Sequence, residues 1–381
     1  MKTLPRRTIL RAALGAAGAT WLTTGCAPFE HAGKGAAFEP WNFPGDETRP
    51  EYLAVRAATL AANPHNTQPW AFRVTADTID VYVDPARALG AMDSLGRERF
   101  IGVGCAIENA VLAARANGRA VEVTLTPDAS DDTWAARLAL TAALPQVDEL
   151  SQVLATRRMN KGAYADVPVP PSTLDGLAAL GDEGGLALRL VTDPPGRALL
   201  RQQSIDALVT LTQDPEMAEA SHRWWRQTDA EVAQHRDGLN LDILGLDATI
   251  RSLAGSSTVV SLSDANAYWL DATRGRHTTG AGYFILSSPE RNSRAAQLRI
   301  GRLFQRAHLY LTTRGVDAHT INMLPELQDR EETTGANARP FTEACQAWVP
   351  PGHGFQMLTR IGFAFDRAVH TPRRGLDEVL R

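Results

Sequence analysis

The sequence predicts an α+β fold in which two related halves of one chain form an intramolecular pseudo-dimer. A chain of 381 residues can hold one large domain or two ordinary ones. Two long helices are expected, over residues 97–117 and about 299–315, each with an early small residue, a central amide, an apolar run and a closing glycine. Each precedes a strand-like run, 121–125 or 318–321, which indicates duplication. Chance likeness between two amphipathic helices is the alternative.

Composition limits the class of protein. Hydrophobic residues make up 44% of the chain and charged residues 22%, which is typical of a soluble globular protein. Residues 1–26 hold four basic residues and no acidic one, so 35 basic residues face 43 acidic ones in the remainder. This acidic balance argues against a nucleic-acid partner, because no basic excess is left to neutralise phosphates.

The N-terminus has the pattern of a targeting segment. Basic residues that include the pair Arg6-Arg7 precede a weakly apolar stretch, so residues 1–26 are expected to form a twin-arginine signal peptide. An ordinary secretory signal is the alternative. We therefore expect a periplasmic or cell-surface location, with a lipid anchor at Cys26 as one outcome. Residues 27–48, rich in Gly, Ala and Pro, are expected to form a tether.

The remaining chain divides into a first half, residues 49–146, and a second half, residues 147–381. The first half is expected to begin with a helix over 51–62 and a strand pair at 70–74 and 78–83. Residues about 212–262 of the second half have no counterpart in the first. Because Trp224 and Trp225 lie between arginines there, this insertion is either a lid over an aromatic ligand or a decoration.

Two cysteines follow Cys26. Cys105 and Cys345 are far apart and match no zinc or CxxC spacing. An oxidising compartment would permit a disulfide between them, but buried free thiols are the favoured interpretation.

Three short segments are candidates for ligand binding. Asn66 and Gln68 lie in a loop between two prolines, and their amides can donate and accept hydrogen bonds at the edge of a planar ligand. A simple polar turn is the alternative. The basic clusters Arg157/Arg158/Lys161 and Arg373/Arg374 suit a phosphate, although each alone could be a solvated face. Together they fit the shape of flavin mononucleotide (FMN).

These motifs resemble a known family. The segment Asn66-Thr67-Gln68-Pro69-Trp70 is similar to the Asn-x-Gln-Pro-Trp signature of the nitroreductases, and Arg157-Arg158 to the family's Arg-Arg-Ser phosphate motif. Asp84-Pro85, Asp93 and Gly96-Arg97-Glu98 resemble more narrowly the Acg-like branch, in which a double-length chain imitates the nitroreductase dimer.

The resemblance implies a nitroreductase-like fold with one complete FMN site and one degenerate site. It implies that Arg157, Arg158, Arg373 and Arg374 hold the phosphate, with Lys161 in the same basic segment, and that Asn66 and Gln68 contact the ring or the ribitol. Backbone amides near Asn322 and Met323 would approach the reactive ring nitrogen. His65 of the same loop is a further candidate for cofactor binding. Met159 replaces the family's usual Ser or Thr, and His65 and Thr67 leave the substrate preference open.

The expected activity is FMN-dependent two-electron reduction of a nitro or quinone-like small-molecule acceptor. Since the flavin supplies this chemistry, we assign no catalytic side chain and no metal ligand. The alternative is an exported FMN-binding or storage protein with a lidded flavin site that excludes substrates. A third hypothesis is that the chain is a binding protein without flavin. Because reduced nicotinamides are scarce outside the cytoplasm, a redox partner protein could replace them. We expect a monomer that acts as a pseudo-dimer.

Overall fold

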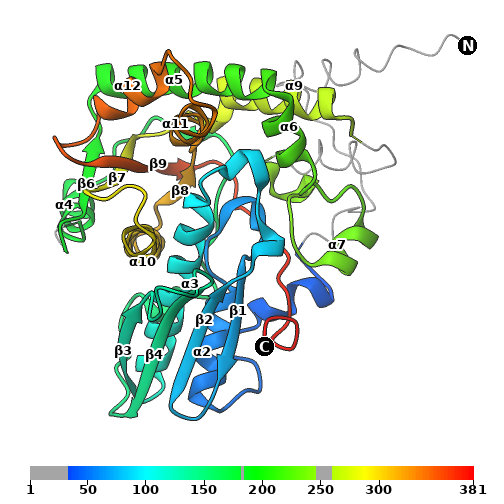
Figure 1. The fold of residues 1–381 in the computed structure, drawn as a ribbon, viewed down its shortest axis with the longest axis vertical. Coiled ribbons are helices and arrows are strands. Elements are labelled where there is room, and N and C mark those ends of the chain that lie inside the picture. The colour runs from blue at the N-terminus through cyan, green and yellow to red at the C-terminus, as the bar shows by residue number, and fades with distance from the viewer. Residues whose placement is uncertain (1–32, 182–183, 246–259) are drawn as a thin grey trace, which may run out of the picture.

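The computed structural model describes residues 33–181, 184–245 and 260–381 (Figure 1). The predicted signal peptide and Cys26 lie outside the described residues. The helices are α2 (Pro50–Thr59), α3 (Arg97–Ala116), α4 (Pro171–Ala179), α5 (Pro194–Gln213), α6 (Pro215–His222), α7 (Asp229–His235), α9 (Leu262–Ala272), α10 (Arg294–Thr313), α11 (Met323–Thr334) and α12 (Pro340–Gln346). The strands are β1 (Trp70–Val74), β2 (Thr78–Val83), β3 (Arg119–Leu125), β4 (Trp134–Ala142), β5 (Tyr164–Ala165), β6 (Ala187–Val191), β7 (Gly282–Ser288), β8 (Asp317–Thr320) and β9 (Gly354–Ala364).

The first half contains an antiparallel sheet of order β1-β2-β4-β3. The predicted strand pair is β1 and β2, and its register pairs Phe72 with Val81. Both residues belong to the core that also contains α2 and α3, so this face of the sheet is covered by helices. Alternating apolar residues along these strands explain why one face is buried.

The second half contains a sheet of order β5-β9-β7-β6, with β8 also paired to β9. Strand β7 is buried along its whole length, as the sequence predicted for residues 283–286. Phe284 and Leu286 share a core with α10, whereas Tyr283 and Ile285 face a second core with α5, α11 and α12. Helices therefore cover both faces of this sheet (Figure 1).

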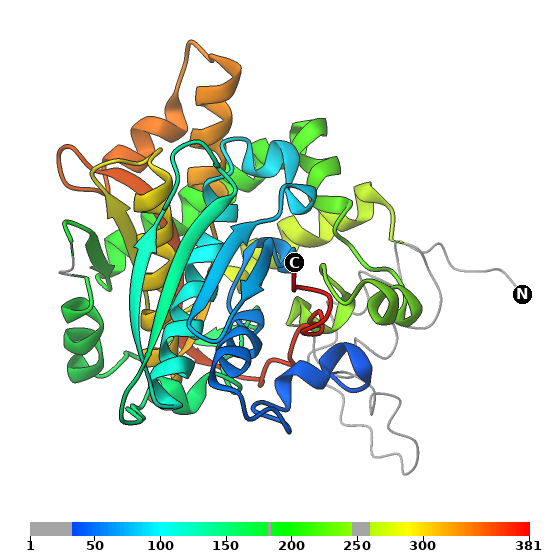
Figure 2. The same ribbon diagram turned by 60° about the horizontal axis from the view of Figure 1, so that its bottom comes forward.

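Helices α3 and α10 lie between the two sheets and join the halves (Figures 1 and 2). A Cβ atom on Gly104 would lie 2.2 Å from the carbonyl oxygen of Leu298, and one on Gly301 would lie 2.0 Å from that of Ile101. The Cys105 thiol donates to the Gly301 carbonyl at 3.2 Å. Only residues without a side chain permit so close a crossing, as the early small residues of both helices predicted.

The central amides of the two helices also meet. Gln305 Nε2 donates to Asn109 Oδ1 at 2.8 Å, and Asn109 Nδ2 donates to the Ala57 carbonyl at 2.9 Å. Gln305 Oε1 accepts from the Ala62 N–H at 3.3 Å, so both fully buried amides have partners where water is excluded. Helix α10 begins at Arg294, earlier than predicted, because Ser293 accepts a hydrogen bond from the Ala296 N–H as an N-cap.

The C-terminal segment crosses from the second half back to the first. Phe72 N–H donates to the Val379 carbonyl at 2.8 Å, and Arg381 N–H donates to the Phe72 carbonyl at 2.8 Å. The chain end thus lies beside the free edge of β1 (Figure 2). The second half thus extends an arm onto the first in addition to the helix interface, and the predicted two-half α+β architecture is confirmed.

Two further sequence interpretations can be compared with the described residues. Cys105 and Cys345 are free and buried, as favoured above. Among the described helices, none combines the length and the apolar character that a membrane crossing requires.

We predict that Gly104→Ala and Gly301→Ala each lower the free energy of unfolding, by about 1–3 kcal/mol, because the added methyl overpacks the helix crossing. Alanine has a higher helix propensity than glycine, so without overpacking the substitution would raise the free energy of unfolding. The sign of the change is therefore informative. Urea unfolding measures the effect. The matched control is Gly275→Ala, whose Cβ meets no atom within 4 Å. A Gly104→Ala protein as stable as the control would contradict the close crossing.

Candidate functional site

The predicted binding loop adopts an unusual backbone. His65, Asn66 and Gln68 have φ angles of 48°, 55° and 51°, in the left-handed region that non-glycine residues rarely occupy. The loop is held from within by Asn63, whose Oδ1 accepts a hydrogen bond from the Gln68 N–H at 2.7 Å. Three strained positions among four residues of one loop indicate that the surroundings impose its shape, as is common at binding sites.

The C-terminal arginines supply those surroundings. Asn66 Oδ1 accepts a hydrogen bond from Arg373, and Asn66 Nδ2 donates to the Pro372 carbonyl at 2.9 Å. Gln68 Oε1 accepts from the Arg374 N–H at 2.9 Å, and the Arg374 guanidinium donates to the Gln68 carbonyl at 2.7 Å. The structure therefore brings four predicted site residues together, and much of their hydrogen-bonding capacity goes to one another.

Arg157 and Arg373 meet at the C-terminal end of α2. Arg157 donates to the Leu60 carbonyl at 2.9 Å, and Arg373 donates to the Ala61 carbonyl at 3.2 Å. The negative end of a helix dipole favours cations in this place. Both side chains are 2% exposed. Burial, and then the mutual repulsion of the two cations, lowers the pKa of Arg373 well below its ordinary value, and burial lowers the pKa of Arg157 to about 10.

This pair belongs to a cluster of positive charge, which we call the arginine cluster: Arg157, Arg158, Arg367 and Arg373, with His370 among them. Within the described chain none of its arginines forms an ion pair. The buried Nε atoms of Arg157 and Arg373 also lack a hydrogen-bond partner there. Burial, and then Arg158 and Arg157, lowers the pKa of His370 to about 3, so His370 is neutral. Buried cations with unpaired donors have the chemistry that binding of an anion requires.

Lys161 lies near the same loop. It is half-buried, and burial lowers its pKa to about 8. Burial, and then the Lys161 charge, lowers the pKa of His65 to about 3, and His65 Nε2 lies 2.9 Å from Ser221 Oγ. The fully buried Arg360 fixes the backbone on both sides of Lys161 by donating to the carbonyls of residues 160 and 162, at 3.3 and 2.7 Å.

Asn322 and Met323 occupy a different corner, at the start of α11. Asn322 Nδ2 donates to Glu98 Oε1 at 2.7 Å, and Asn322 Oδ1 accepts from the Leu358 N–H at 2.9 Å. Met323 is buried in the core on the α5 side of the second sheet. Among the described contacts, no hydrogen bond links these two residues to the arginine cluster.

The described part of the insertion lies against the binding loop. Gly238 N–H donates to the Asn66 carbonyl at 3.1 Å, and Gln68 Nε2 donates to the Arg236 carbonyl at 2.7 Å. Asp237, between them, accepts from Arg87 at 2.8 Å, and Arg87 also donates to the Thr67 carbonyl at 2.8 Å. These contacts fit the lid interpretation better than a distant decoration.

Residues 33–48, assigned to a tether above, contain a short helix, Ala36–Trp41, that packs on the site. The Trp41 ring stacks on His370 with centroids 4.0 Å apart, and Trp41 Nε1 donates to the Thr371 carbonyl at 2.8 Å. Arg373 N–H donates to the Ala37 carbonyl at 2.7 Å. Sequence reasoning missed this contact, although the aromatic residues at positions 38, 41 and 43 were a signal that the segment is anchored.

Comparisons with known proteins agree with this architecture. The chain is 33% identical over 183 residues to "Putative NAD(P)H nitroreductase Rv3131" of Mycobacterium tuberculosis, a match that covers 47% of this chain and spans about half, 51%, of that relative. It is 23% identical over 337 residues to "Putative NAD(P)H nitroreductase acg" of the same organism, covering 86% of this chain and 93% of Acg. No family model matches the chain.

Solved structures similar to the chain include two nitroreductases named NfnB. The enzyme of Mycobacterium smegmatis, described as FMN-dependent and in complex with NADPH, has 18% identity and a TM-score of 0.36 over 61% of this chain and 97% of its own. The FMN- and NADPH-dependent enzyme of a sphigopyxis strain has 16% identity and a TM-score of 0.39 over the same shares.

The similarity to Acg extends across both halves, and the two halves pack as a fused pair. The predicted fold class is thereby confirmed, and the chain is similar to Acg over most of its length.

Proposed function

We propose that this protein binds one FMN and is an oxidoreductase of the nitroreductase type. The observation that carries the proposal is the arginine cluster beside the strained Asn66 loop, since its buried cations have no carboxylate partner in the described chain. The relatives named as NAD(P)H nitroreductases support an oxidoreductase of this type.

The residues present fit a phosphate. Leaving guanidinium groups buried and unpaired costs free energy, and a dianion that accepts charge-assisted hydrogen bonds would recover it. Arg157 and Arg373 come from the second half and approach the end of a first-half helix, so a cofactor held there would be bound by both halves. Asn66 and Lys161 lie on the neighbouring segments and would orient the rest of the molecule.

A bound FMN would take two electrons from a donor and pass them to an acceptor. The protein's part is to hold and orient the cofactor and to set the charge around it. Lys161, with a pKa of about 8, would be charged at neutral pH and would favour an electron-rich ligand. Arg360 would keep the Lys161 backbone in place through the two flanking carbonyls.

The acceptor in this proposal is a small molecule such as a nitro compound or a quinone. The names of the relatives favour a reduced nicotinamide as the electron donor, and a redox partner protein is the alternative. Export by the twin-arginine route to the periplasm or cell surface, with or without a lipid at Cys26, remains part of the proposal. Export would favour a redox partner protein over a reduced nicotinamide as the electron donor.

A second function, FMN binding or storage behind a lid that excludes substrates, is favoured by one observation. The insertion is hydrogen bonded directly to the backbone of the loop at Asn66, which would close the approach from that side. The two functions predict different reactions of the loaded protein with NADPH.

We predict that Arg157→Met and Arg373→Met each weaken FMN binding about 10- to 100-fold, because each removes a hydrogen bond between charged groups worth about 1.5–3 kcal/mol. Quenching of FMN fluorescence measures the affinity. Riboflavin, which lacks the phosphate, should bind the wild type and both variants with similar, weaker affinity.

The matched control is Arg115→Met, an exposed arginine of α3, which should leave FMN affinity unchanged. Variants that lose riboflavin and FMN binding equally would show that these arginines do not serve the phosphate.

The storage function predicts that the FMN-loaded wild type bleaches slowly with NADPH under anaerobic conditions and quickly with dithionite, and that Asp237→Ala accelerates the NADPH reaction. This substitution removes the Asp237 ion pairs with Arg87 at 2.8 Å and Arg226 at 2.5 Å, which hold the insertion on the loop. Absorption near the flavin band is the measurement.

Asp229→Ala, an exposed acid in the same insertion, is the control. Fast bleaching of the wild type together with slower bleaching of Asp237→Ala would instead make the insertion a substrate-binding element and favour the reductase function.

A further inference from the structure

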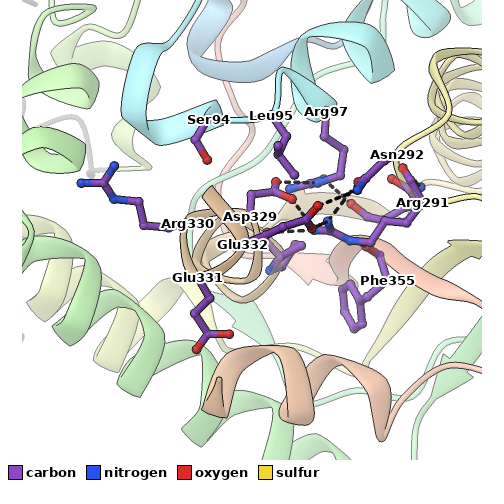
Figure 3. Close-up of polar contacts among 12 residues, drawn as sticks. Ser94, Leu95, Arg97, Arg291, Asn292, Asp329, Arg330, Glu331, Glu332 and Phe355 are labelled. Carbon is purple, nitrogen blue, oxygen red and sulfur yellow. Dashed lines mark hydrogen bonds and ion pairs between the residues drawn. The ribbon is translucent and has the colours of Figure 1, made fainter. Parts of the chain in front are cut away.

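A second group of charges is buried at the junction of α3 and α11, and here carboxyl groups outnumber cations. Asp93, Glu98 and Glu326 are each 6% exposed and Asp329 is fully buried. The cations that face them are Arg97, Arg291 and, farther out, Arg294. Figure 3 shows Arg97 and Arg291 on either side of Asp329.

Two of the four carboxyl groups accept hydrogen bonds from well-placed donors. Asp329 accepts hydrogen bonds from Arg97 Nε at 2.9 Å and from Arg291. Asp93 accepts from the N–H groups of Glu98 and Arg99, both at 2.9 Å, at the positive end of α3. Both therefore have partners that favour the ionised carboxylate.

The carboxyl groups of Glu98 and Glu326 have fewer hydrogen-bond partners. Glu98 Oε1 accepts from Asn322 at 2.7 Å and has only a long contact, 3.4 Å, with Arg97. The Glu326 carboxylate forms no described hydrogen bond, and its buried Oε2 has no partner in the described chain. Two carboxylates cannot both stay ionised without water or a cation when they are buried close together.

We propose that Glu98 and Glu326 form a carboxyl pair that shares one proton near neutral pH and thereby sets the charge beside Asn322. The inference rests on the proposed function only where it concerns FMN. Glu98 contacts Asn322 through its carboxylate, at 2.7 Å, and Glu326 through its backbone N–H, at 3.0 Å, so both are positioning residues for that corner.

The titration of the pair follows from burial. Burial raises the pKa of Glu98 to about 7. Burial, and then the Glu98 charge, raises the pKa of Glu326 well above its ordinary value. Burial also raises the pKa of Asp93. Since Arg97 and Asp329 face both glutamates, the fixed charges around the pair partly cancel, and the mutual repulsion decides how many protons it holds.

The first test is stability against pH in the cofactor-free protein. Because Glu98 binds its proton more tightly when folded than when unfolded, stability should fall as pH rises from about 4.5 to about 7. Glu326→Gln keeps the shape and removes the repulsion. We predict a melting temperature at least about 2 °C above wild type at pH 8, and a difference that disappears at pH 5.

The matched control is Glu331→Gln on the same helix. Glu331 is also buried, but its carboxylate accepts from the N–H groups of Phe341 and Thr342, at 2.9 and 2.8 Å. This variant should lose stability at pH 8. A Glu326→Gln protein that is destabilised equally at pH 5 and pH 8 would overturn the shared proton.

A spectroscopic test avoids stability altogether. Infrared difference titration of the folded protein should show a protonated carboxyl band that disappears with a midpoint near pH 7. The band should be missing in the Glu98→Gln/Glu326→Gln double variant and present in Glu331→Gln. A band unchanged in the double variant would assign the proton elsewhere and refute the pair.

The link to the cofactor has its own measurement. In FMN-loaded protein the midpoint potential should change its pH dependence near pH 7, and Glu326→Gln should remove that change. An identical pH dependence in wild type and variant would overturn the coupling. Failure to bind FMN at all would instead refute the proposed function, while the stability and infrared tests would still decide the pair.

Discussion

The contact between Gly104 of α3 and Gly301 of α10 is the constraint on which the rest of the structure depends. The backbones approach so closely that a methyl group on either residue would overlap a carbonyl oxygen of the other helix. This crossing sets the distance and angle between the two sheets, and Asn109 with Gln305 fixes its register. Because the candidate site is built from both halves, its geometry follows from this crossing.

The buried charges are separated by sign. Cations without carboxylate partners in the described chain gather at the end of α2, and excess carboxyl groups gather where α3 meets α11. Burying either set weakens folding, since isolated charges lose their hydration. Such an arrangement is better explained by a ligand than by stability: an anion would compensate the first set, and a retained proton would relieve the second.

Two segments outside the repeated core close over the site from different sides. The helix that contains Trp41 covers His370, and residues 236–238 lie against the backbone of the Asn66 loop. A fused chain with one complete site needs only one copy of each binding motif. The second half can therefore carry an insertion that the first half lacks. This asymmetry explains why one chain can combine a nitroreductase-like core with a covered site, as the storage alternative requires.

The sequence by itself determined the fold class, the strand pair 70–83, the two central helices and the contiguous motifs around Asn66, Arg157 and Arg373. Periodicity, small residues and loop prolines act over a few positions, so these features can be read locally. Only the tertiary structure decided that Gln68 and Arg374, 306 positions apart, bind each other. It also decided that Trp41 covers His370 and that Glu98 and Glu326 share a buried corner. Burial and partner identity depend on which distant segments meet, and local spacing does not encode that.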